Sequence, residues 1–139
     1  MNGYLLDTNI ISEVIRSTPH TRVVTFLVEH DDLWLSSIVI HELEYGLQHM
    51  AQGQRRSGLQ DSLRGGIAEY EDRILPLETI GAEWAALFRA QAHRFGRTLD
   101  LGDALIAGTA KTHDLAIATR NVRDFDVLEV QVVNPWKTR

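Results

Sequence analysis

The sequence contains no cysteine in its 139 residues. Disulfide bonds and zinc sites built from cysteine thiolates are therefore excluded. The N-terminus also lacks a basic region followed by an apolar stretch, which is the pattern of a secretory signal. No apolar run approaches the roughly 20 residues that a membrane-spanning helix needs. We therefore expect a cytoplasmic protein that has no membrane partner.

Positive charge is also scarce, because 14 lysines and arginines face 19 acidic residues and the formal net charge is −5. This balance argues against a protein that coats nucleic acid by bulk electrostatics. The basic residues still form short patches, each of which is accounted for as solvated surface: Arg55-Arg56, Arg94 with Arg97, Arg120 with Arg123, and Lys137 with Arg139. Arg120 and Arg123 are the candidates for nucleic-acid contact, because they flank an acidic candidate residue, Asp124.

The composition is otherwise ordinary for a globular protein, with 44% hydrophobic and 24% charged residues. The length suits one domain that buries its own core. The sequence contains no internal repeat, linker or low-complexity segment. We therefore expect a single domain over residues 1–139.

Short apolar segments alternate with longer segments of helical character. The predicted strands are residues 3–6, 33–36, 74–77, 115–119 and 127–133. The predicted helices span about 8–16, 19–29, 38–50, 59–72, 79–95 and 101–113. A polar turn is expected at 52–58, and Gly65-Gly66 weaken the predicted helix 59–72. Alternating strands and helices predict an α/β fold whose parallel sheet is covered on both faces.

Four acidic residues far apart in sequence each stand beside an apolar run: Asp7, Glu42, Asp103 and Asp124. A carboxylate costs several kcal/mol to bury unless it is paired, hydrogen-bonded or bound to a cation. Ligands of parallel α/β sheets bind beyond the carboxyl ends of the strands, where Asp7 and Thr119 are expected. The pattern therefore indicates that the fold gathers these acids around a hard cation such as Mg²⁺ or Mn²⁺.

Each acid also has a simpler explanation. Asp7 could be an ordinary N-cap of the following helix, with no further role. Glu42 and Glu44 differ by about 200° around a helix, so one is expected inward and the other solvated, and Glu42 is favoured as inward. Asp100 and Asp103 are spaced to share a helix face, with Asp100 either a cap or an outer ligand.

The loop after the fourth predicted strand holds polar residues that suit either a turn or a site. Thr119 and Asn121 are able to orient a carboxylate or a metal-bound water. The same residue types, together with Asp124, also form ordinary polar loops. The argument for a site therefore depends on all of these residues together.

Four segments carry a resemblance to a known family: Leu5-Leu6-Asp7-Thr8-Asn9, Ser36 to Gly46 with Glu42-Leu43, Asp103-Ala104-Leu105-Ile106-Ala107, and Thr119-Arg120-Asn121 followed by Asp124-Phe125. In this order, which covers nearly the whole chain, they resemble PIN-domain ribonucleases of the VapC toxin type, in the FitB-like branch. The resemblance implies a three-layer α/β/α sandwich with a mainly parallel central sheet. It implies that Asp7, Glu42, Asp103 and Asp124 bind Mg²⁺ or Mn²⁺, and that Thr8, Asn9, Thr119 and Asn121 orient them or metal-bound waters. Asp100 departs from the family, which often has proline or an uncharged residue there.

The resemblance further implies a metal-dependent endoribonuclease, the toxin of a toxin–antitoxin pair, which hydrolyses RNA and inhibits translation and growth. The implied partners are the RNA substrate, an antitoxin, a second copy of the chain in a homodimer, and DNA in a higher assembly with the antitoxin. One alternative is a non-catalytic partner in a DNA-binding regulatory complex. Another is a receiver-like phosphate-accepting domain, which is a poor match because Lys111 and Lys137 do not stand at predicted strand ends.

Overall fold

A five-stranded parallel sheet forms the centre of the protein. The structure, a computed structural model, describes residues 3–137, so Arg139 of the last basic patch lies outside the described residues. The strands are β1 (Tyr4–Leu6), β2 (Leu33–Ser36), β3 (Ile74–Leu75), β4 (Ala116–Ala118) and β5 (Val132–Val133), in the order β3-β2-β1-β4-β5. Tyr4 pairs with Leu33 on one side and Ala116 on the other. The first strand is therefore central, between β2 and β4.

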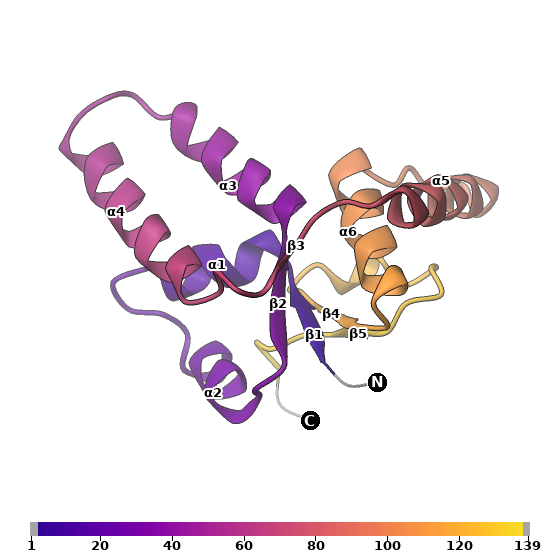
Figure 1. The fold of residues 1–139 in the computed structure, drawn as a ribbon, viewed down its shortest axis with the longest axis horizontal. Helices are drawn as coiled ribbons and strands as arrows, with labels where there is room; N and C mark the ends of the chain where they lie inside the picture. The colour runs from indigo at the N-terminus through magenta and orange to yellow at the C-terminus, as the bar shows by residue number, and fades with distance from the viewer. Residues whose placement is uncertain (1–2, 138–139) are drawn as a thin grey trace.

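Helices lie on both sides of this sheet. They are α1 (Thr8–Val14), α2 (Thr21–Glu29), α3 (Ser37–Gln48), α4 (Gln54–Ala68), α5 (Thr79–Arg94) and α6 (Leu101–Thr112), followed by the 3-10 turn η1 (Val122–Asp124). Figure 1 shows α2, α3 and α4 to the left of the strands and α5 and α6 to the right. The predicted α/β/α architecture with a parallel central sheet is confirmed. None of the helices within residues 3–137 is long and apolar enough to cross a membrane.

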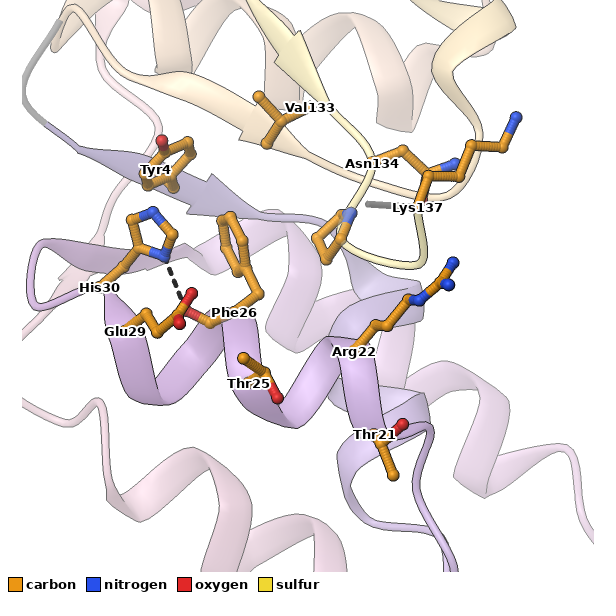
Figure 2. A pocket seen from close by; sticks show the side chains of 11 residues that line it. Tyr4, Thr21, Arg22, Thr25, Phe26, Glu29, His30, Val133, Asn134 and Lys137 are labelled. Atoms are coloured by element: carbon orange, nitrogen blue, oxygen red, sulfur yellow. Dashed lines mark hydrogen bonds between the residues drawn. The ribbon is translucent and has the colours of Figure 1, made fainter. Parts of the chain in front are cut away.

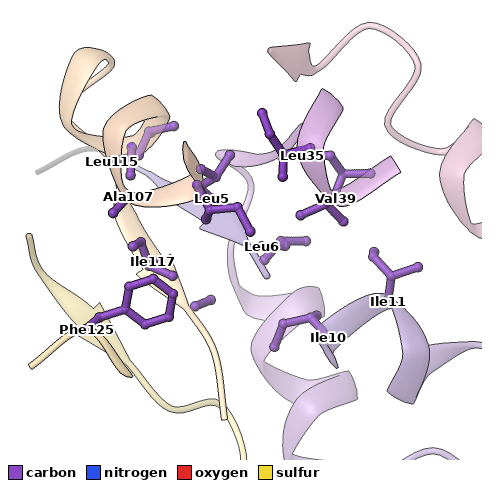
Figure 3. Close-up of a cluster of buried hydrophobic side chains, with 14 of the residues drawn as sticks. Leu5, Leu6, Ile10, Ile11, Leu35, Val39, Ala107, Leu115, Ile117 and Phe125 are labelled. Carbon is purple, nitrogen blue, oxygen red and sulfur yellow. The ribbon is translucent and has the colours of Figure 1, made fainter. Parts of the chain in front are cut away.

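The core is built around the central strands. Leu5 and Leu6 are fully buried although their side chains point to opposite faces of the sheet. Figure 3 shows them among apolar side chains from several elements, including Ile10, Ile11, Leu35, Val39, Ala107, Leu115, Ile117 and Phe125. Strands buried on both faces read as continuous apolar runs, which explains the sequence pattern at residues 3–6.

Two predicted boundaries are wrong. Helix α4 begins at Gln54 inside the predicted turn, because its polar first residues are exposed rather than unstructured. The predicted strand 127–133 is ordered as a strand only at Val132–Val133. Val127 and Val130 are apolar because this loop packs against the core, with a turn closed by the Leu128 amide donating to the Phe125 carbonyl.

Gly65 and Gly66 do not interrupt α4. A Cβ on Gly66 would stand 3.1 Å from Ile15 Cγ2, so this glycine allows close approach near α1. A Cβ on Gly65 would meet nothing within 4 Å.

Helices α5 and α6 pack closely through glycine. A Cβ on Gly108 of α6 would overlap the carbonyl oxygen of Gly81 of α5 and stand 3.0 Å from the Ala85 nitrogen. Ala104 and Ala107 of α6 are fully buried as well. These small residues along α6 let α5 pack closely against it, and this packing fixes the position of the helix that carries Asp103.

Candidate functional site

Asp7 lies at the carboxyl end of the central strand and caps α1. Its Oδ1 accepts a hydrogen bond from the Thr8 amide at 2.8 Å, and its Oδ2 accepts one from the Thr119 hydroxyl at 2.7 Å. The residue is only 4% exposed, and its burial raises the pKa of the carboxyl against the lowering effect of these two bonds. Asp7 is therefore a helix cap, and it is also tied to the loop after β4.

Glu42 is brought to Asp7 through Thr8. The Thr8 hydroxyl donates to Glu42 Oε1 at 2.6 Å, while the Thr8 amide binds Asp7. Helix α3 starts directly after β2, and the Ser36 side chain caps it by accepting a hydrogen bond from the Val39 amide at 3.2 Å. Glu44 is half-buried like Glu42, so the expectation of a solvated Glu44 is wrong. The hydrogen bond to Thr8 distinguishes Glu42 from Glu44.

Thr119 is the centre of a small polar network. Its hydroxyl donates to Asp7 and accepts from the Asn9 side-chain amide at 3.2 Å and from the Asn121 backbone amide at 3.0 Å. The Arg120 amide in turn donates to Asn9 Oδ1 at 3.3 Å. Thr119 is fully buried, so these bonds hold its hydroxyl in one orientation. The polar residues predicted to support the acids thus lie around Asp7.

Asp103 and Asp124 line an acidic cavity of about 380 Å³, together with Asp100. Burial raises the pKa of Asp103 to about 7, reinforced by the negative charges of Asp7, Asp124, Asp100 and Glu42. The four predicted acids and Asp100 therefore act on one another electrostatically, although they come from separate parts of the chain. Asp100 is the N-cap residue of α6 but makes no side-chain capping bond.

Gly102 is a residue of this site that the sequence analysis missed. A Cβ at this position would overlap Glu42 Oε2 and stand 3.3 Å from Asp100 Oδ2. The absent side chain allows Glu42 of α3 to approach the start of α6. A glycine next to Asp103 in the first turn of a helix was the available signal, since glycine is unfavourable there unless space requires it.

Glu13 is a buried carboxylate whose charge is stabilised by hydrogen-bond and ion-pair partners within the protein. Its Oε2 accepts from the His20 amide at 2.9 Å and lies 3.1 Å from the Arg16 guanidinium. The pKa of Glu13 is lowered, first by the bond from His20. By contrast, like charges surround Asp103, and its pKa is raised.

The donors of the acidic site fit a hard divalent cation in kind. They are carboxylate oxygens, the ligands that Mg²⁺ and Mn²⁺ prefer, and a cation would offset the repulsion that adds to burial in raising the Asp103 pKa. Within residues 3–137, no three histidine or acidic side chains already converge closely enough to form a ready metal cage.

The two arginines singled out in the sequence have different surroundings. Arg123 lines the acidic cavity, whereas the Arg120 guanidinium lies over the Trp136 ring, 5.2 Å from its centroid. Arg97, which the sequence analysis placed only in a surface patch, also lines the cavity. It donates to Asp126 Oδ1 at 2.5 Å and to the Arg123 carbonyl.

A second cavity, of about 530 Å³, lies between α2 and the segment after β5. Figure 2 shows Tyr4, Phe26 and His30 side by side there, with His30 bonded to the Phe26 carbonyl at 2.7 Å. Glu29 is its one acidic lining residue. The predicted acids do not contribute, so this hollow is separate from the candidate site.

Comparisons with known proteins agree with this arrangement. A family model described as the PIN domain matches residues 4–130. Toxin FitB of Neisseria gonorrhoeae is 38% identical over 135 residues, 95% of this chain and 97% of the relative. VapC ribonuclease Y4jK of Sinorhizobium fredii is 33% identical over 136 residues, 96% of this chain and 97% of the relative. The structure of FitAB bound to an IR36 DNA fragment contains a chain that is 34% identical with a TM-score of 0.88, covering 98% of this chain and 97% of that one.

Proposed function

This chain belongs to the PIN-domain family, in the group of the FitB and VapC toxins, and from that premise we propose that it is a metal-dependent endoribonuclease. It forms one PIN domain over residues 1–139 and acts as the toxin of a toxin–antitoxin pair in the cytoplasm. Cleavage of RNA phosphodiester bonds by this enzyme inhibits translation and growth. The observation that carries the proposal is the convergence of acids from separate parts of the chain: Thr8 joins Asp7 to Glu42, and Asp100, Asp103 and Asp124 line one cavity.

Asp7, Glu42 and Asp103 would hold Mg²⁺ or Mn²⁺, with Asp124 contributing directly or through water. When bound, such an ion activates water as the nucleophile and offsets the negative charge that develops on the phosphate. The protein's own contribution is orientation. Thr8 holds Glu42, Thr119 holds Asp7, and Asn9 and Asn121 hold Thr119. Such supporting hydrogen bonds fix the direction of carboxylate ligands.

Cleavage of a total RNA pool tests the proposal. We expect discrete products with Mg²⁺ or Mn²⁺ and none with EDTA. Glu42→Gln should lower the cleavage rate at least about tenfold, since it removes a charged ligand from the ion. Glu44→Gln is the matched control, because Glu44 lies two positions further along the same helix and should retain activity. Metal-independent products, or equal effects of the two variants, would contradict the proposal.

Thr8→Val tests the role of the hydroxyl that joins the two acids. The valine keeps the backbone amide that binds Asp7 and loses the 2.6 Å bond to Glu42. We expect the metal concentration for half-maximal cleavage to rise about 10-fold to 100-fold, with recovery at saturating metal. Thr25→Val, at an exposed position of α2, should leave this metal concentration unchanged. A lower rate that excess metal fails to restore would argue against this positioning role.

The partners follow from the relatives. The similar FitAB structure is described as bound to a DNA fragment. We propose that this chain forms a homodimer, pairs with a cognate antitoxin, and joins DNA through that complex. The alternative of a non-catalytic partner in such a complex predicts salt-sensitive DNA binding by the complex but no RNA cleavage by the free chain. Measuring both activities on the same preparation separates the two functions.

A further inference from the structure

Positive side chains gather at the end of α5. Arg89, His93 and Arg94 are exposed and line a groove of about 440 Å³ together with Ala90, Arg97, Thr98 and Leu99. Arg89 and His93 are four residues apart, which places them on one face of the helix. We refer to these seven residues as the basic groove.

The basic groove adjoins the acidic cavity. Arg97, Thr98 and Leu99 line both hollows, so one side of the shared segment faces Arg89 and Arg94 and the other faces Asp103 and Asp124. Arg97 is held at this junction by Asp126 and by the Arg123 carbonyl. A strand that leaves the acidic cavity past Arg97 would enter the basic groove.

Helix stability explains only part of this charge. His93 and Arg94 lie in the last turn of α5, where positive charge favours the helix dipole. Arg89 lies more than one turn earlier, and Arg97 lies beyond the helix. Within residues 3–137, no carboxylate stands at salt-bridge distance from Arg89 or Arg94. Their charges are therefore available to a phosphate.

An exposed aromatic residue stands at the same helix end. Phe95 is the C-cap of α5 and its side chain is 66% exposed. Phe95 follows Arg94 directly in the chain. An exposed aromatic ring close to basic side chains suits single-stranded nucleic acid, because bases stack on the ring while cations contact the backbone. Paired bases are not free to stack in this way.

We propose that the basic groove and Phe95 bind the single-stranded RNA segment that flanks the bond to be cut. Arg89 and Arg94 contact phosphates, and Phe95 stacks on an unpaired base. Arg97 and Arg123 lead the strand into the acidic cavity. This proposal rests on the ribonuclease activity proposed above, and it adds that the substrate is unpaired over this segment.

The test measures RNA binding without cleavage. A fluorescein-labelled single-stranded RNA of mixed sequence is titrated with the Asp103→Asn protein in Mg²⁺, and the anisotropy is followed at several salt concentrations. Adding Arg89→Gln and Arg94→Gln should weaken binding and reduce the slope of log affinity against log salt by about 1.4, or about 0.7 for each lost phosphate contact. Phe95→Ala should weaken binding at least about fivefold while leaving that slope unchanged.

The matched control removes two arginines elsewhere. Arg55→Gln with Arg64→Gln makes the same charge change on α4, which Figure 1 places on the opposite side of the strands from α5. The proposal is overturned if the two double variants bind alike, or if Phe95→Ala binds as tightly as its parent. Failure of wild-type protein to cleave RNA would instead count against the ribonuclease proposal, since the binding assay involves no cleavage.

Discussion

Asp103→Asn is expected to lower RNA cleavage at least about 100-fold while making the metal-free protein more stable. Burial, together with the charges of the other four carboxylates, raises the pKa of Asp103 to about 7. Its charge would attract the cation in the active protein, and this loss corresponds to about 2.7 kcal/mol of barrier. Without the cation, the same charge is repelled by its neighbours. A site selected for catalysis in this way costs stability.

The stability gain should depend on pH in a definite direction. The folded pKa of Asp103 lies above the ordinary value of 3.8, so the folded protein binds more protons than the unfolded chain between about pH 4 and 7. Stability from this group is therefore lost as pH rises through that range, and the penalty is constant above it. Asparagine removes the penalty. We expect a gain of roughly 1–2 kcal/mol at pH 8, after allowing for solvent screening of this half-buried group, and almost none at pH 4.

Urea denaturation in EDTA from pH 4 to 8.5 measures this gain directly. Asp61→Asn is the control, because it makes the same chemical change at an exposed position of α4 outside the acidic cavity. A gain for Asp103→Asn that is the same at every pH would contradict the electrostatic explanation. Loss of cleavage without any gain in stability would mean that Asp103 is needed for catalysis but is not repelled by the neighbouring carboxylates.

Gly108→Ala is expected to destabilise the protein by about 1–3 kcal/mol. The new methyl group would overlap the Gly81 carbonyl oxygen and press on the Ala85 nitrogen, so α5 and α6 must move apart. Gly65→Ala on α4 is the matched control, because its methyl group meets nothing within 4 Å. It should stabilise by roughly 0.5–1 kcal/mol, since alanine favours a helix. Thermal denaturation distinguishes the two, and effects of the same sign would refute the packing argument.

The sequence allowed the sheet and the meeting of Asp7 with Thr119 to be predicted, because strand ends in a parallel sheet share one edge. The ends of individual helices and strands were harder to predict from the sequence. Polar residues at the start of α4 reflect solvent exposure rather than a turn, and the apolar Val127, Leu128 and Val130 reflect loop packing rather than a strand. The approach of Gly102 to Glu42 and the position of Arg97 depend on helices that contact only after folding.

The hydrogen bond between Asp7 and Thr119 joins residues 112 positions apart, and the central strand β1 pairs with β4 late in the chain. Residues near the N-terminus leave the ribosome first, whereas a domain folds as a unit. During synthesis, the Asp7 carboxylate therefore lacks both its Thr119 partner and the neighbouring Asp103 until most of the chain has been made. The complete acidic site can therefore form only after α6 and β4 have been made, because α6 carries Asp103 and the segment after β4 carries Thr119.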